Sequence, residues 1–131
     1  MATIFSKIIK GEIPSYKIAE NEEFYAFLDI FPLTKGHTLV IPKKETDYLF
    51  DIDDDVLGRM MIFSKSIALA IKKTISCQRV GVAVVGLQVP HAHIHLIPIT
   101  KESDMHFNNP KLKLTTDEFQ TIAENVQANI Q

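Results

Sequence analysis

Three of the five histidines stand two positions apart, at His91, His93 and His95. Apolar residues separate them and follow them, which is typical of a strand that turns one face to a core. Successive side chains of a strand point to opposite faces, so the three imidazoles would share one face. Imidazole can act as a metal ligand, a proton carrier or a nucleophile, so chemistry is expected on this face.

Three interpretations of the histidine face stay open on the residues alone. The first is a half-buried polar face without function, although neutral imidazoles need hydrogen-bond partners and charged ones repel. The second is a metal site, since imidazole is a common zinc ligand. The third is nucleophilic and acid–base work at phosphorus, because an ordinary pKa of about 6.5 leaves much of the imidazole neutral at pH 7.

A second short segment carries a fourth histidine. His37 follows a loop over residues 32–36, and the acidic residue Asp29 lies just upstream of that loop. An apolar run from Leu39 to Ile41 then ends at a proline, which stops a strand. This histidine and this carboxylate form a second local signature.

The rest of the chain predicts the elements that would hold these segments. Thr3 is placed to cap a short helix over 4–9, and Gly11 to end it. The other expected elements are hairpin strands at 16–20 and 23–29, a strand at 37–41, a long helix from Asp53 or Asp54 to about 75, strands at 80–85 and 92–99, and a tail helix opened by the capping box of Thr115 and Glu118. This order predicts an α+β fold with a five-stranded antiparallel sheet and the long helix on one face.

Length, charge and cysteine content limit the class of protein. The 131 residues suit one domain, and 46% apolar residues supply a core. A formal net charge of −2 without a basic stripe argues against nucleic-acid and membrane partners. The single cysteine, Cys77, fits a reducing compartment. No signal peptide or membrane-spanning run is visible, so a cytoplasmic location is predicted.

Ordered segments at 4–14, 27–30, 36–42 and 91–97 together resemble the histidine-triad (HIT) family of nucleotide hydrolases and transferases, in its Hint-like branch. The triad of histidines separated by apolar residues gives that family its name. The resemblance covers residues 3–99 and implies a single HIT domain over 1–131. Its core would lie at 3–99, and a C-terminal extension would carry a helix at about 116–130.

The resemblance implies a two-step transfer at the α-phosphorus of a nucleoside phosphoramidate or a related nucleotide conjugate. His93 would attack and form a nucleotidyl-histidine intermediate, which water would hydrolyse to a nucleoside monophosphate. His95 would contact the phosphate oxygens and the leaving group. His91 and His37 would make the hydrogen-bond relay that fixes the tautomer of the nucleophile. No metal and no cofactor are expected.

The resemblance also assigns nucleotide-binding residues. Asp29 would bind the ribose, and a carboxylate can indeed accept hydrogen bonds from two vicinal hydroxyls. The expected base pocket consists of Phe5, Ile8, Ile13, Phe27 and Ile30. The expected partner is a small purine nucleotide. Plain core packing is the alternative for these apolar residues, and a solvated loop position is the alternative for Asp29.

The chain departs from many relatives in the loop before the triad, which is shorter here. Gln88 is the polar side chain left in that loop, where its amide could donate to a phosphate oxygen. The shortening leaves room for a non-catalytic nucleotide-binding regulatory module on the same fold. Some bacterial relatives hold a structural zinc where this chain has Thr3, Ser6 and Glu45. Hard oxygens replace thiolates there, so no structural zinc is expected.

The long helix and the strand at 80–85 predict a symmetric homodimer. The helix is apolar around more of its circumference than one sheet face can cover. The strand is apolar on both faces and carries no charge to protect an edge. The family resemblance implies sheets joined edge to edge across the twofold axis with the long helices packed together. The alternative is a monomer whose tail helix folds over this surface.

Overall fold

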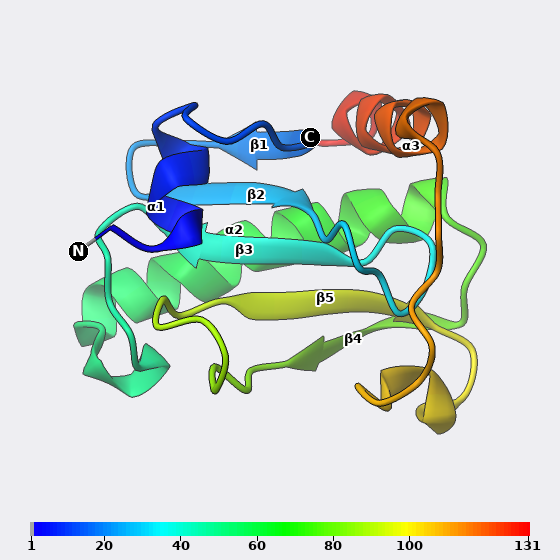
Figure 1. Ribbon diagram of the computed structural model, residues 1–131. Helices are drawn as coiled ribbons and strands as arrows, with labels where there is room; N and C mark the ends of the chain where they lie inside the picture. Colours follow the sequence, from blue (N-terminus) through cyan, green and yellow to red (C-terminus); the bar gives the residue numbers. More distant parts are fainter. Residues whose placement is uncertain (1) are drawn as a thin grey trace.

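A computed structural model, which describes residues 2–131, has a five-stranded sheet at its centre (Figure 1). The strands are β1 (Lys17–Glu20), β2 (Phe24–Leu28), β3 (Thr38–Pro42), β4 (Arg79–Ala83) and β5 (Ile94–Ile99). Their order in the sheet is β1-β2-β3-β5-β4, and every neighbouring pair is antiparallel. The predicted α+β fold with a five-stranded antiparallel sheet is therefore confirmed.

The first two strands form the predicted hairpin. The side chain of Asn21 closes it, because its Oδ1 accepts from the backbone N–H groups of Glu23 and Phe24 at 2.9 and 2.8 Å. An asparagine that binds backbone groups two and three residues ahead mimics a turn and fixes the connection. The hairpin places β2 inside the sheet, between β1 at the edge and β3 at the centre.

The helices begin at the positions that the sequence predicts, although Asp53, which precedes α2, makes no capping hydrogen bond with its side chain. They are α1 (Ile4–Ile9), α2 (Asp54–Thr74) and α3 (Thr116–Ala128), with two 3₁₀ turns, η1 (Leu49–Asp51) and η2 (Glu102–Met105), that the sequence did not predict. Thr3 Oγ1 accepts from the Ser6 N–H at 3.0 Å, and Thr115 and Glu118 form the expected capping box. A capping side chain satisfies backbone donors that the first turn leaves free.

Helices lie on both faces of the sheet (Figure 1). The long helix α2 covers one face with Ile67 and Ile71, which pack against Val40, Ile94 and Leu96 of the central strands. The short helix α1 lies across the other face. The tail helix α3 packs on α2 and β1, at the sheet edge opposite β4, so it covers part of α2 and leaves β4 uncovered.

The triad strand starts later than predicted, at Ile94 rather than at residue 92. The pairing of Val40 with Ile94 would, if continued, place Ala92 opposite Pro42. Proline has no N–H to donate, so the ladder stops there. The Ala92 N–H donates instead to the carbonyl of Thr46 at 2.6 Å.

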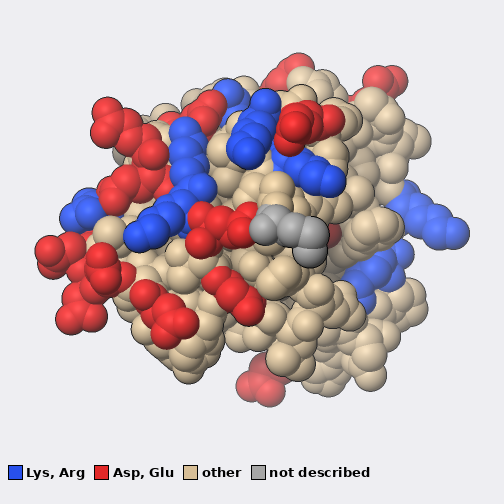
Figure 2. Space-filling model, turned by 60° about the vertical axis from the view of Figure 1, so that its left-hand side comes forward, with Lys and Arg blue, Asp and Glu red and all other residues tan. Residues whose placement is uncertain are grey.

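The surface shown in Figure 2 mixes blue and red side chains, so that face presents no broad basic stripe. Within residues 2–131, no helix combines the length and the apolar character needed to cross a bilayer.

Candidate active site

A pocket of about 640 Å³ opens on the α1 side of the sheet. Its walls come from α1, the end of β2 with the loop that follows, the loop before the triad, and β5. Ten of the eleven candidate residues line it: Phe5, Ile8, Ile13, Phe27, Asp29, Ile30, His37, Gln88, His93 and His95. His91 is fully buried behind the wall.

His93 is oriented by the backbone of the residue two positions before it. Its Nδ1 lies 2.8 Å from the carbonyl oxygen of His91. A carbonyl can only accept, so Nδ1 carries the proton and donates it. In the neutral ring, Nε2 of His93 then holds an unprotonated lone pair. This is the tautomer that a nitrogen nucleophile at Nε2 requires.

His95 is oriented by a second buried imidazole. The Leu33 N–H donates to Nδ1 of His37 at 3.0 Å, so the proton of neutral His37 sits on Nε2. That Nε2 lies 2.9 Å from Nδ1 of His95 and donates to it. The remaining proton of His95 is therefore on Nε2. The sequence-based expectation paired His37 with the nucleophile, whereas the structure places His37 against His95.

Burial keeps three of these imidazoles uncharged at neutral pH. Loss of solvent lowers the pKa of His37 to about 3, with His95 nearby as a further cause. It lowers the pKa of His95 to about 4, and it also lowers the pKa of His91. His95 is thus a neutral hydrogen-bond donor at pH 7 rather than an imidazolium.

Asp29 begins the loop that carries His37. Its Oδ1 accepts from the Phe31 N–H at 2.8 Å, and its Oδ2 lies 3.7 Å from Nε2 of His37. Burial raises the pKa of this carboxyl group. Because the Phe31 N–H is bound by Oδ1, Oδ2 keeps lone pairs at the pocket wall, where it could accept from hydroxyl groups of a bound molecule.

The apolar wall of the pocket is built on Phe5 and Phe27. Their ring centroids are 5.6 Å apart in an edge-to-face arrangement, and Phe5 meets His93 at 5.1 Å in the same manner. Such contacts fix the plane of the imidazole. Ile30 is 55% exposed at the rim. Gln88 is also exposed, on the short loop.

A family model of the HIT domain matches residues 10–102. This chain belongs to the histidine-triad family. Adenosine 5'-monophosphoramidase HNT1 of Saccharomyces cerevisiae is 45% identical over 98 residues, which cover 74% of this chain and 62% of the yeast protein. The protein of the same description from Schizosaccharomyces pombe is 31% identical over 132 residues, or 99% of each chain.

A crystal structure of a Hit-like protein involved in cell-cycle regulation from Bartonella henselae is also similar to this HIT protein. It superposes with a TM-score of 0.84 at 33% identity, and the match covers 98% of this chain and 96% of that one.

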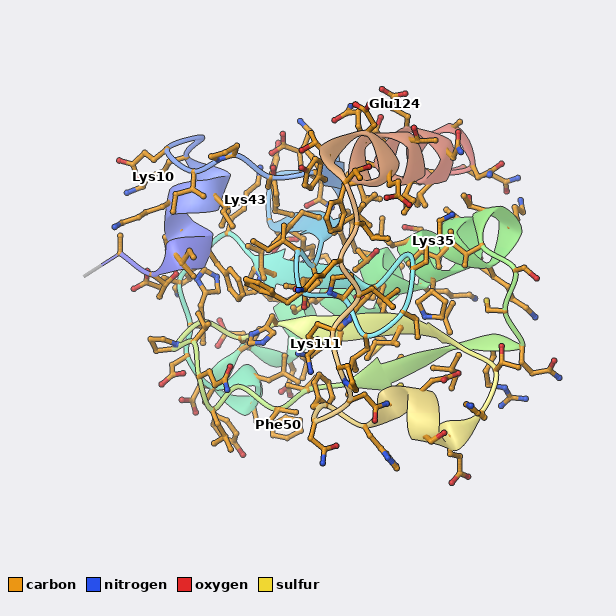
Figure 3. All side chains as sticks on the ribbon, turned by 45° about the vertical axis from the view of Figure 1, so that its right-hand side comes forward. Lys10, Lys35, Lys43, Phe50, Lys111 and Glu124 are labelled. Atoms are coloured by element: carbon orange, nitrogen blue, oxygen red, sulfur yellow. The ribbon has the colours of Figure 1, made fainter. Side chains whose placement is uncertain are left out.

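Phe107 and Lys111 are among the pocket residues of this HIT protein that were not predicted from the sequence. Phe107 meets His95 edge to face, with centroids 4.8 Å apart, and Lys111 also lines the pocket. Both belong to the segment after η2, which crosses in front of β5 and is tied back by the Leu112 N–H to the carbonyl of Pro32 (Figure 3). Neither residue lies in a periodic segment, so no sequence signal marked them.

One group in residues 2–131 offers three metal-ligating side chains close together, namely Asp29, His37 and His95. Their ligand atoms all lie within 4.8 Å of one another. A metal ion there would have to displace the hydrogen bond between the two imidazoles. Measuring turnover with and without a metal chelator therefore distinguishes a metal-dependent reaction from attack by imidazole alone.

Proposed function

We propose that this HIT protein is a nucleotidyl hydrolase or transferase that cleaves nucleoside phosphoramidates through a nucleotidyl-histidine intermediate. The observation that carries the proposal is the tautomer of His93. Its Nδ1–H is committed to the His91 carbonyl, and its Nε2 lone pair belongs to a side chain on the pocket wall. A neutral imidazole held in this manner is prepared to attack phosphorus.

In the first step, Nε2 of His93 forms a bond to the α-phosphorus and the bond from phosphorus to the leaving nitrogen breaks. The leaving amine takes a proton from water. In the second step, a water oxygen attacks phosphorus, the bond to Nε2 breaks, and a nucleoside monophosphate is released, while the proton lost by the attacking water neutralises the hydroxide left by the first step. The Nε2–H of His95 stabilises the phosphate oxygens as a hydrogen-bond donor, because its lowered pKa leaves no second proton to give.

The pocket supports a nucleotide as the ligand class. Phe5, Phe27 and Ile8 offer an apolar wall for a base, and Asp29 offers acceptor lone pairs for ribose hydroxyls. Two similar proteins are adenosine 5'-monophosphoramidases. Adenosine phosphoramidate is therefore the first substrate to test on this chain, and a purine is the proposed base.

An activity panel tests the proposal. Adenosine and guanosine phosphoramidates and diadenosine polyphosphates are supplied to the protein with and without EDTA, and release of the monophosphate is measured. Turnover of a phosphoramidate that survives EDTA is expected. Binding of nucleotides without any turnover would make the chain a regulatory binding module instead. Turnover lost in EDTA and restored by zinc would favour metal chemistry at Asp29, His37 and His95.

The homodimer remains a proposal, which the exposed apolar side chains of α2 support. Ile62 and Leu69 stand seven positions apart on this helix and are both exposed, as is Val82 of the edge strand β4. Met60 and Phe63 lie on the same helix but do not belong to this exposed stripe. Met60 is buried in the core, and Phe63 packs against Phe24. A twofold axis would let the exposed stripe cover itself.

Sedimentation equilibrium at low micromolar concentration tests the dimer. We expect about twice the 14.8 kDa of one chain. Changing Ile62 and Leu69 together to Glu should give the single-chain mass, while Gln120→Glu on the exposed side of α3 should leave the dimer intact. A single-chain mass for the unchanged protein would end the dimer proposal.

A further inference from the structure

A second polar cluster lies behind the triad, outside the nucleotide pocket. Thr3 and Ser6 come from the start of α1, and Glu45 comes from the segment after β3. Oε1 of Glu45 accepts from Ser6 Oγ at 2.6 Å and from the Thr3 backbone N–H at 3.0 Å. Thr3 Oγ1 lies 2.8 Å from Nδ1 of His91. The cluster therefore joins an exposed carboxylate to a fully buried imidazole.

The direction of each hydrogen bond in this cluster follows from its partners. Nε2 of His91 lies 2.8 Å from the carbonyl oxygen of Pro42, which can only accept, so Nε2 carries the proton. Nδ1 of neutral His91 must then accept, and the Thr3 hydroxyl is its donor at 2.8 Å. Ser6 Oγ, at 3.2 Å, is the more distant of the two acceptors within reach of the single Thr3 hydroxyl hydrogen. The Ser6 hydroxyl gives its hydrogen to Glu45, which lowers the pKa of that carboxyl group. Both nitrogens of His91 are thus committed.

The same cluster reaches the nucleophile through the backbone. The carbonyl of His91 accepts from Nδ1 of His93, so a displaced His91 would displace the acceptor that sets the His93 tautomer. The cluster also fixes the start of α1, whose Phe5 meets the rings of His91 and His93 at 5.7 and 5.1 Å. Two restraints on His93 therefore depend on one set of hydrogen bonds.

The side chains of Thr3, Ser6 and Glu45 do not fit a structural zinc. The three oxygen-bearing side chains offer no thiolate, and they already bind one another and His91. A borderline-soft ion such as zinc would gain hard ligands only by breaking this network.

We propose that Thr3, Ser6 and Glu45 form a positioning cluster that, without a metal, holds His91 and His93 in the tautomers needed for attack. The proposal rests on the function proposed above. It assigns the largest effect to Thr3, which touches His91, and smaller effects to Glu45 and Ser6, which act through Thr3.

The test compares Thr3→Val with Thr3→Ser. Valine keeps the shape but removes the hydroxyl, so kcat should fall roughly 10- to 100-fold, the size of effect seen when residues that orient metal-bound imidazoles are lost. The Kd for AMP should stay within about twofold, and Thr3→Ser should restore kcat. Thr115→Val is the matched control, because Thr115 makes the same capping bond at the start of α3, far from the triad. It should leave kcat unchanged.

A second readout separates positioning from stability. Long-range ¹H–¹⁵N spectra of the imidazoles should show single tautomers for His91 and His93 in the unchanged protein and averaged shifts in Thr3→Val. Glu45→Ala should lower kcat less than Thr3→Val does, and Glu45→Gln, which still accepts from Ser6 and Thr3, should recover most of it.

Two outcomes would overturn the cluster. One is a folded Thr3→Val protein with unchanged kcat, and the other is unchanged imidazole shifts for His91 and His93. If Thr3→Val does not fold, Glu45→Ala and Glu45→Gln are compared instead, by kcat and by the imidazole shifts of His91 and His93. A lack of turnover in the unchanged protein would count against the proposed function alone, since the imidazole shifts still test the cluster.

Discussion

The two faces of the sheet differ in how completely they are covered. On one face, the 21-residue α2 and the 13-residue α3 enclose a continuous apolar cluster that includes Phe24, Leu28 and Ile94. On the other face, the six-residue α1 covers a smaller cluster around Phe27 and leaves the pocket beside it. We call the face under the long helices α2 and α3 the closed face, and the face that the short helix α1 covers only in part the open face.

Successive side chains of β5 point alternately to the closed face and to the open face. Ile94 of β5 points to the closed face, while His95, its neighbour, points to the pocket. Because adjacent residues serve different faces, packing and chemistry can be changed separately. Variants on the closed face should change stability, and variants on the open face should change turnover.

The strongest test of this separation is His93→Ala on the open face. Loss of the proposed nucleophile should lower kcat on the order of 10⁴-fold or more, because the proposed covalent intermediate forms on its Nε2. The Kd for AMP should change little. Initial rates and calorimetric titration measure the two quantities. His106→Ala, at an exposed histidine outside the pocket, is the control, and a near-normal kcat for His93→Ala would remove His93 as nucleophile.

Acid should destabilise the protein mainly through the open face. Burial lowers the pKa of His37 to about 3 and of His95 to about 4, whereas the unfolded chain binds these protons near pH 6.5. Their contribution is therefore fully present above pH 6.5 and is lost as the pH falls through 3, on the order of 5 kcal/mol for His37.

Urea unfolding between pH 7.5 and pH 4 measures this loss. The variant His37→Gln should show a smaller slope of unfolding free energy against pH, whatever its stability at pH 7. His106→Gln removes an exposed imidazole and should keep the full slope. An identical slope in His37→Gln would show that acid acts elsewhere.

On the closed face, Ile94→Ala should reduce stability with little effect on chemistry. Ile94 is 0% exposed, so truncation leaves a cavity and should lower the free energy of unfolding by roughly 2–5 kcal/mol. The kcat per folded molecule, measured well below the melting temperature, should stay within about threefold. A large loss of kcat at full folding would show that the two faces are coupled through β5.

The elements were predictable where local chemistry fixes them. Thr3 and Thr115 cap their helices through their own side chains, and Asn21 closes the hairpin, so each signal sits within four residues of its effect. The family was likewise evident from the triad and its flanking segments. The start of β5 was predicted two residues early because the limiting residue, Pro42, lies on another strand.

The candidate site was predictable as a set of residues but not as a set of contacts. Ten of the candidates meet at one pocket. The pairing of His37 with His95 and the bond from Thr3 to His91 join segments 58 and 88 positions apart, which no periodicity reveals. Phe107 reaches the pocket from a segment without regular structure.

The smallest expected effect, and the finest test of the open face, is Asp29→Asn. Asparagine keeps the acceptor that binds the Phe31 N–H, so the loop should hold its shape. It loses the negative charge that strengthens hydrogen bonds from ribose hydroxyls, which are worth about 1.5–3 kcal/mol to a charged group. The Kd for AMP should therefore rise roughly tenfold or more. For 2′-deoxy-AMP the rise should be smaller, because that ligand has one hydroxyl fewer to lose.

Calorimetric titration of both ligands gives the ratio of the two changes in Kd, and Asp51→Asn on η1, outside the pocket, is the control. Equal weakening of the two ligands would take Asp29 out of the ribose role and leave it as a residue that shapes the loop carrying His37.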